Sequence, residues 1–193
     1  MKKSIIVFLL FFAGILIGGF WANFKINQLG KDSDLILKNG VWRYFTSMDL
    51  ATNELQKAYI GKIGLLALQD SEVIYFIAST DEEGNPLSSS NDYKLTGSSF
   101  DTRYWSYTLY GEDHFLIPND KGVFSFNMEN IVYKDSLKNS YELIVSRDPK
   151  KENWLPAGEA NNMSILLRLY NSAENVYKNK DAIELPTLKK INQ

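Results

Sequence analysis

Residues 104–110 read YWSYTLY, a stretch dense in the aromatic and β-branched residues that favour strands. Successive side chains of a strand point to opposite faces of a sheet. One face would carry Trp105, Tyr107 and Leu109, and the other Tyr104, Ser106, Thr108 and Tyr110. We expect the first face to enter a hydrophobic core. The second face, with phenols beside hydroxyls, is suited to stacking on sugars or gripping a partner, unless the strand is covered on both sides.

Other short apolar and aromatic runs surround this stretch at intervals of about ten residues, with turn residues between them. We expect strands at 73–78, 93–96, 114–117, 123–126, 141–146 and 163–170. Residues 41–45 form either a further strand or a lead-in segment. This spacing is typical of a mainly β fold, and we predict a jelly-roll-like β-sandwich over residues 41–193.

One helix is expected before these strands, over residues 49–68. Its leucines fall near helical spacing, and Asp49 is suited to cap its first turn. Gly61 and Gly64 each weaken a helix by about 1 kcal/mol, which indicates either close packing on a sheet or an earlier helix end. A second, shorter helix is expected near 173–176.

The amino-terminal region contains an uninterrupted apolar run over residues 5–22, IIVFLLFFAGILIGGFWA. A helix of this length reaches roughly 27 Å, close to the hydrocarbon thickness of a bilayer. We therefore predict a transmembrane anchor or uncleaved signal over residues 1–26, a tether over 27–40, and membrane contact through residues 5–22. Cleavage after Ala22 is disfavoured because bulky Phe20 would occupy the third position back from the cut, whereas cleavage after Gly19, with Ile17 at that position, is tolerable.

The charges next to this run predict its orientation. Lys2 and Lys3 favour a cytoplasmic amino terminus, although Lys25 follows the run. We predict a single-pass protein of the bacterial inner membrane, with its domain on the periplasmic or external side.

Composition excludes several classes of function. Residues 1–26 hold three lysines and no acid, so the remainder carries 18 basic and 23 acidic residues, a net charge of −5. Such a domain lacks the basic footprint of a nucleic-acid-binding protein. The chain has no cysteine and a single histidine, which excludes thiolate and multi-histidine metal sites. We predict no metal site, no cofactor and no nucleic-acid partner.

Five residues are predicted to take part in binding. They are Tyr104, Trp105, Tyr110, Trp154 and Arg168. Trp154 lies in an expected loop, where the following proline fixes the backbone. Arg168 lies between two leucines, and burying it alone would be costly, so it reaches water or pairs with an acid. No catalytic residue is identified.

The alternative is a carbohydrate-active or other hydrolase that uses a pair of carboxylates. The candidate acids all lie in expected turns: Asp81, Glu82, Glu83, Glu112 and Asp113. Acids in turns are usually solvated or bonded to nearby backbone amides. His114 stands next to Asp113, but neighbours on a strand point to opposite faces. The sequence therefore favours a non-enzymatic module.

Several of these segments together resemble a known family. They are Asp81-x-x-Gly84-x-Pro86-Leu87, Tyr93, the aromatic stretch 104–110, Asn153-Trp154-Leu155-Pro156 and Arg168-Leu169-Tyr170. From about residue 42 to residue 193 the chain resembles the domain of unknown function 1214 (DUF1214) family. The resemblance implies a β-sandwich of jelly-roll type with a helix at its start, and no established reaction. Gly158 departs from the family pattern, in which a second proline is usual after Asn-Trp-Leu-Pro.

From these observations we predict a membrane-anchored envelope protein whose β-sandwich binds a glycan or protein partner.

Overall fold

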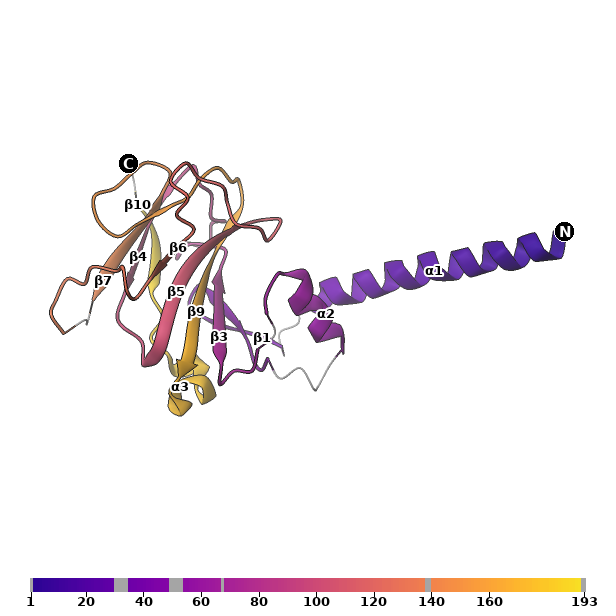
Figure 1. Cartoon of the computed structure of the whole chain (residues 1–193), viewed down its shortest axis with the longest axis horizontal. Coiled ribbons are helices and arrows are strands. Elements are labelled where there is room, and N and C mark those ends of the chain that lie inside the picture. The colour runs from indigo at the N-terminus through magenta and orange to yellow at the C-terminus, as the bar shows by residue number, and fades with distance from the viewer. Residues whose placement is uncertain (1, 30–34, 49–53, 67, 138–139, 192–193) are drawn as a thin grey trace.

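The computed structural model describes residues 2–29, 35–48, 54–66, 68–137 and 140–191. Its first element is α1 (Lys2–Leu29), a long helix that projects away from two β-sheets (Figure 1). Its side chains are almost all exposed, and residues 3–29 are long and apolar enough to cross a membrane. This amino-terminal helix fits either a signal anchor or a signal sequence.

The larger sheet has six antiparallel strands. In spatial order they are β1 (Ile36–Asn39), β2 (Trp42–Phe45), β3 (Val73–Ala78), β9 (Met163–Ser172), β5 (Thr102–Gly111) and β6 (Ser125–Asn127). The long strands β5 and β9 pair over their whole lengths, with Ser106 opposite Arg168. This pairing joins two segments that lie some 60 residues apart in the sequence.

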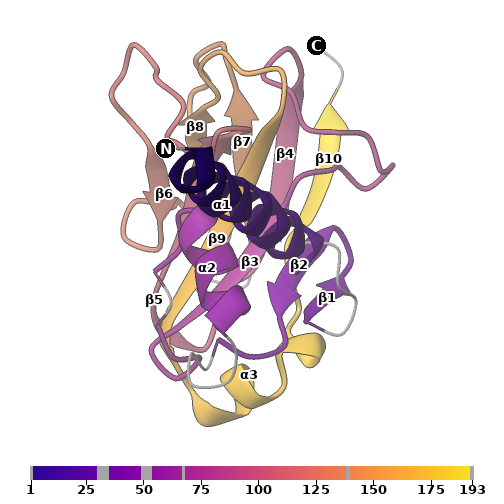
Figure 2. The ribbon, with the colours of Figure 1, turned by 90° about the vertical axis from the view of Figure 1, so that its right-hand side faces the viewer.

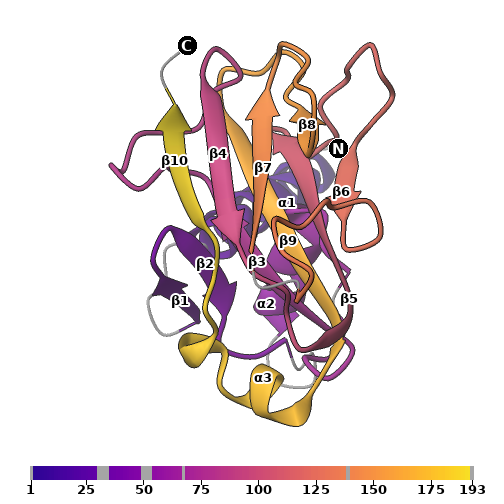
Figure 3. The same cartoon turned by 90° about the vertical axis from the view of Figure 1, so that its left-hand side faces the viewer.

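The smaller sheet has four strands and is seen face-on in Figure 3. In spatial order they are β10 (Thr187–Ile191), β4 (Asp92–Gly97), β7 (Tyr141–Ser146) and β8 (Trp154–Pro156). β8 runs parallel to β7, and the other pairs are antiparallel. The two sheets pack face to face, which confirms the predicted β-sandwich.

The core between the sheets is rich in aromatic rings. Trp105, Tyr107 and Leu109 of β5 all point into it, as the alternation predicts. The Trp105 ring stacks on Tyr141 of the smaller sheet, with centroids 5.4 Å apart. The hydroxyls of Tyr107 and Tyr141 are hydrogen-bonded to each other. Aromatic packing therefore joins the sheets at the centre of the sandwich.

The outer face of the larger sheet has a second, smaller core. Helix α2 (Glu54–Lys62) lies over this face and buries Ile60 completely (Figure 2). Its partners include Phe45 of β2, Tyr75 of β3 and Leu166 of β9. Of the predicted helix 49–68, residues 49–53 lie outside the described residues, and the helix ends at Lys62. The earlier end is explained by the glycines, because Gly64 adopts a left-handed φ of +73°.

Several predicted boundaries differ from the structure. α1 continues to Leu29, and the predicted tether 27–40 contains β1, which pairs with β2. The strand predicted at 114–117 is a turn with one isolated bridge, between Tyr110 and Leu116, and β6 begins two residues later than predicted. Trp154 lies in strand β8 rather than in a loop. After β9 come α3 (Glu174–Lys178) and the 3₁₀-helix η1 (Lys180–Ala182).

Candidate functional site

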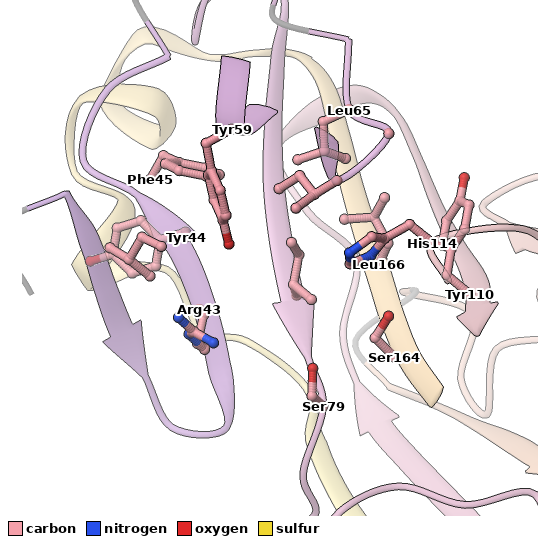
Figure 4. A pocket seen from close by; sticks show the side chains of 14 residues that line it. Arg43, Tyr44, Phe45, Tyr59, Leu65, Ser79, Tyr110, His114, Ser164 and Leu166 are labelled. Carbon is pink, nitrogen blue, oxygen red and sulfur yellow. The ribbon is translucent and has the colours of Figure 1, made fainter. Parts of the chain in front are cut away.

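A cavity of about 140 Å³ lies between α2 and the outer face of the larger sheet (Figure 4). A cavity of roughly 150 Å³ accommodates benzene, so this one has room for a single six-membered ring. Apolar side chains from α2, the segment after it and the sheet form much of the wall: Ile36, Phe45, Ile63, Leu65, Ile77 and Leu166.

Polar groups enter this cavity from four different elements. Arg43 comes from β2, Ser79 follows β3, Ser164 comes from β9, and His114 comes from the turn after β5. Among the described residues that line the cavity, none is an aspartate or a glutamate. The lining therefore combines two basic side chains with hydroxyl groups, an arrangement suited to an anionic or hydroxyl-rich ligand.

The turn after β5 gives His114 its position. His114 has a left-handed φ of +65°, and its N–H donates to the carbonyl of Gly111. The Asp113 carboxylate accepts the N–H of Phe115 at 3.0 Å, which holds the next step of the turn. The His114 carbonyl lies 3.6 Å from where a Cβ of Gly64 would stand, so this turn packs closely on the segment after α2.

Tyr110 connects the cavity to a cationic group on the open part of the sheet. Its ring lines the cavity, and its hydroxyl accepts a 2.6 Å hydrogen bond from Arg168 Nη2. Arg168 Nη1 donates to Thr108 Oγ1 at 3.0 Å. Among the described residues Arg168 forms no ion pair with a carboxylate. Hydroxyl groups therefore orient this guanidinium without neutralising it.

Further tyrosines extend this face beyond Arg168. The rings of Tyr104 and Tyr170 lie 5.7 Å apart. Burial raises the pKa of Tyr104, and the nearby Glu129 carboxylate adds to this shift. Burial likewise raises the pKa of Tyr75 to about 12, and its hydroxyl donates to the Leu66 carbonyl at 2.8 Å. Both phenols are thus protonated donors at neutral pH.

The structure brings three of the five predicted binding residues together on this face. These are Tyr104, Tyr110 and Arg168. Trp105 points the other way and is fully buried in the sandwich core, so it lines no surface. Trp154 lies in the smaller sheet, where its indole N–H donates to the Ser146 carbonyl at 3.1 Å.

The comparisons with known proteins bear on the family and the fold of the chain. The model of the family described as "Protein of unknown function (DUF1214)" matches residues 72–174, which is more than half of the chain. The chain belongs to the DUF1214 family. The match covers the strands that carry Tyr75, Tyr110 and Arg168, whereas β2 and α2, which form the opposite wall of the cavity, precede it.

Two crystal structures resemble this DUF1214 protein in fold. The VPA0106 protein of Vibrio parahaemolyticus has 21% sequence identity and a TM-score of 0.59, over 72% of this chain and 35% of its own. An uncharacterised protein of Burkholderia cenocepacia has 16% identity and a TM-score of 0.51, over 91% of this chain and 42% of its own. The DUF1214 chain thus spans less than half of either protein. None of the curated proteins matches it.

Sequence reasoning missed several residues of this candidate site. Arg43 is one of them, although the alternation in residues 41–45 carried a signal. Trp42 and Tyr44 are buried between the sheets, so Arg43 between them must point to the outer face. Ser164 and Tyr170 could have been found in the same way, from their spacing along β9 relative to Arg168.

The candidate acids of the hydrolase alternative are engaged in local contacts. Asp81 is buried, and its Oδ1 accepts the N–H groups of Glu83 and Asn85 at 3.0 and 2.9 Å. Glu82 Oε1 accepts the N–H of Leu188, and Glu112 Oε2 accepts from the Asn162 amide. Among the described residues, no group of three or more His, Asp or Glu side chains could hold a metal ion.

Proposed function

We propose that this DUF1214 protein is a membrane-anchored module of the bacterial envelope that binds an acidic glycan on the outer face of its larger sheet. Helix α1 serves as the anchor in the inner membrane, and the sandwich lies on the periplasmic side. One sugar ring of the glycan occupies the cavity beneath α2, and the next residues of the glycan lie along the open part of the sheet.

The lining of the cavity carries this proposal. Its volume of about 140 Å³ fits one six-membered ring. Arg43 and His114 supply donors for a sugar carboxylate, and Ser79 and Ser164 supply hydroxyl groups for the ring (Figure 4). Because no described lining residue is an acid, an anionic ligand meets no like charge there.

The neighbouring face supports an extended ligand. Arg168 offers further N–H groups beyond the two that bond Thr108 and Tyr110. Planar guanidinium groups bind carboxylates in a bidentate manner. The exposed parts of Tyr104 and Tyr170 offer aromatic surface beside it, on which sugar rings stack.

The hydrolase alternative receives less support from the geometry. Carboxylate catalysis needs two acids that face a common substrate site. Asp81, Glu82 and Glu112 are each hydrogen-bonded to neighbouring backbone or amide groups, and none of them lines the cavity. We therefore propose binding without hydrolysis.

The proposal is tested by calorimetry on the full chain in nanodiscs, with trigalacturonate as the acidic probe and maltotriose as the neutral one. We expect trigalacturonate to bind and maltotriose to bind far more weakly. Arg168→Gln should lower the affinity for trigalacturonate about tenfold, the loss of one charge-assisted contact. Arg103→Gln is the matched control, because Arg103 is an exposed arginine of the same strand β5 as Tyr110.

Ser164→Val and Tyr110→Ala extend the test to the cavity itself. The first narrows the cavity and the second removes one wall, so both should weaken trigalacturonate binding. Absence of binding by the native chain, or equal affinity in the variants and the native chain, overturns the proposal. Release of new reducing ends from the probe would instead support the hydrolase alternative.

A further inference from the structure

Helices α1 and α2 are held together by hydrogen bonds close to the end of the apolar run. Lys62 Nζ, on the last residue of α2, donates to Asn23 Oδ1 at 3.1 Å and to Asn27 Oδ1 at 2.5 Å. Asn23 directly follows Ala22, the last residue of the apolar run. The carboxyl-terminal end of α2 is therefore held at a defined height along α1, and α2 lies beside the end of α1 nearer the sheets (Figure 1).

That height lies in the headgroup layer of a bilayer. Asn27 is five residues beyond Ala22, which corresponds to about 7.5 Å along a helix. The headgroup region on each side of the hydrocarbon core is roughly 5–8 Å thick. If residues 5–22 fill the hydrocarbon, Asn23, Asn27 and Lys62 all lie at headgroup level. Trp21, whose ring lies 5.9 Å from Lys25 Nζ, then stands at the interface, where tryptophan is enriched.

Two exposed apolar side chains lie close to this end of α2. Leu66 is 72% exposed and follows α2 by four residues, and Phe115 is 73% exposed. Phe115 follows His114, whose carbonyl packs on Gly64. We call the patch made by Lys62, Leu66 and Phe115 the basal surface.

The charges of the two helices match those of an anionic membrane surface. The described part of α1 beyond the apolar run and α2 together hold Lys25, Lys57 and Lys62 against one acid, Glu54. The rest of the domain is acidic overall, so these two helix segments differ from it in the sign of their net charge. Basic residues near an anionic leaflet are attracted to its surface.

We propose that the basal surface docks on the headgroup layer of the same membrane that holds α1. This inference rests on the proposed role of α1 as an anchor. The domain is then held against the bilayer instead of moving freely on a tether. The cavity beneath α2 shares Ile63, Gly64, Leu65 and His114 with the segments that carry the basal surface, so its ligand is bound close to the lipid headgroups.

The lack of cysteine in the chain permits a direct test with single nitroxide labels. The variants Leu66→Cys and Phe115→Cys report on the basal surface. Leu137→Cys is the matched control, since Leu137 is 78% exposed. It belongs to the segment between β6 and β7, which lies on the side of the sandwich away from α1 (Figure 1). Ile15→Cys reports on insertion of α1. Each labelled full-length chain is placed in nanodiscs of zwitterionic and anionic phospholipid, and its accessibility to oxygen and to a nickel chelate is measured.

The expected result is a deep position for label 15, headgroup depth for labels 66 and 115, and free solvent access for label 137. The ratio of oxygen to nickel accessibility should be several-fold higher at 66 and 115 than at 137. If labels 66 and 115 are as accessible to nickel as label 137 while label 15 remains deep, the docking is overturned and the anchor is not. Label 15 in water would overturn the anchor and the docking with it.

Discussion

Arg168 donates a 2.6 Å hydrogen bond to the hydroxyl of Tyr110, and its guanidinium carbon lies 5.6 Å from the centre of the same ring. The contact joins β9 to β5, and Thr108 adds a second bond from the same strand. One side of the guanidinium is thereby fixed against the sheet, which leaves its other N–H groups for a ligand. Tyr110, which also lines the cavity, is a positioning residue for Arg168.

Tyr110→Phe should lower the free energy of unfolding by about 1–2 kcal/mol, because it removes a hydrogen bond to a charged group but keeps the ring. The measurement is urea unfolding of the full chain in detergent micelles, followed by tryptophan fluorescence. Tyr104→Phe is the control, since no described residue bonds the Tyr104 hydroxyl, and it should change stability by less than about 0.5 kcal/mol. Equal effects of the two variants would contradict the positioning role.

Lys180→Met should destabilise the fold by about 3–5 kcal/mol, because it leaves a partly buried carboxylate without its cation. The buried Lys180 ammonium donates to Asp70 Oδ2 at 2.7 Å and to the carbonyls of Phe45 and Thr46 at 3.1 and 2.9 Å. It thereby ties η1 to the end of β2 and to the segment before β3.

The double variant Lys180→Met/Asp70→Leu distinguishes the lost ion pair from general damage to this region. Removing both charges avoids the unpaired carboxylate, so the double variant should be more stable than Lys180→Met alone. Thermal unfolding of both variants, monitored by circular dichroism, provides the comparison. A double variant less stable than Lys180→Met would show that the carboxylate was not the cause.

Local patterns were sufficient to predict most of the strands and the two faces of β5. Trp105 and Tyr107 are in the core and Tyr104 and Tyr110 are on the outer face because the pleat alternates strictly. The strand at 114–117 failed for a local reason that was harder to see. The Asp113 carboxylate accepts the N–H of Phe115, and His114 has a left-handed φ, so these residues form a turn instead of a strand.

The candidate site depended on contacts that no local pattern contains. Arg168 was expected to reach water or pair with an acid, but it bonds hydroxyls of β5, because β5 and β9 pair across 60 residues of sequence. The order of the strands in the two sheets could not be predicted from local patterns either. The cavity, in turn, requires α2 to lie over β2, β3 and β9, and the helical pattern alone does not say which face a helix covers.

Gly158→Ala should destabilise the protein by more than about 2 kcal/mol, because the backbone strain of a left-handed φ adds to a steric collision of the new Cβ. Gly158 has a left-handed φ of +59°, and a Cβ there would lie 2.3 Å from the Pro118 carbonyl oxygen. Gly122→Ala is a matched control with a φ of +63° and open space around it, so it should cost only the backbone strain of about 1 kcal/mol. The difference between the two melting temperatures isolates the collision, and equal temperatures would show that the turn can relax.

The stability of the native chain should fall as the pH rises above about 10, the ordinary pKa of tyrosine. Burial raises the pKa of Tyr75 to about 12 and that of Tyr107 well above its ordinary value. At pH values between the unfolded and the folded pKa of these tyrosines, the unfolded chain binds fewer protons than the native chain. The free energy of unfolding therefore decreases as the pH rises. Below about pH 10 both states are protonated, so these groups do not make stability depend on pH. Urea unfolding of the native chain and of Tyr75→Phe at several pH values checks this. We expect Tyr75→Phe to be less stable at neutral pH, because it lacks the hydrogen bond to the Leu66 carbonyl. Its free energy of unfolding should, however, decline less steeply at alkaline pH. A decline equally steep in Tyr75→Phe and the native chain would exclude Tyr75 as a source of the pH dependence.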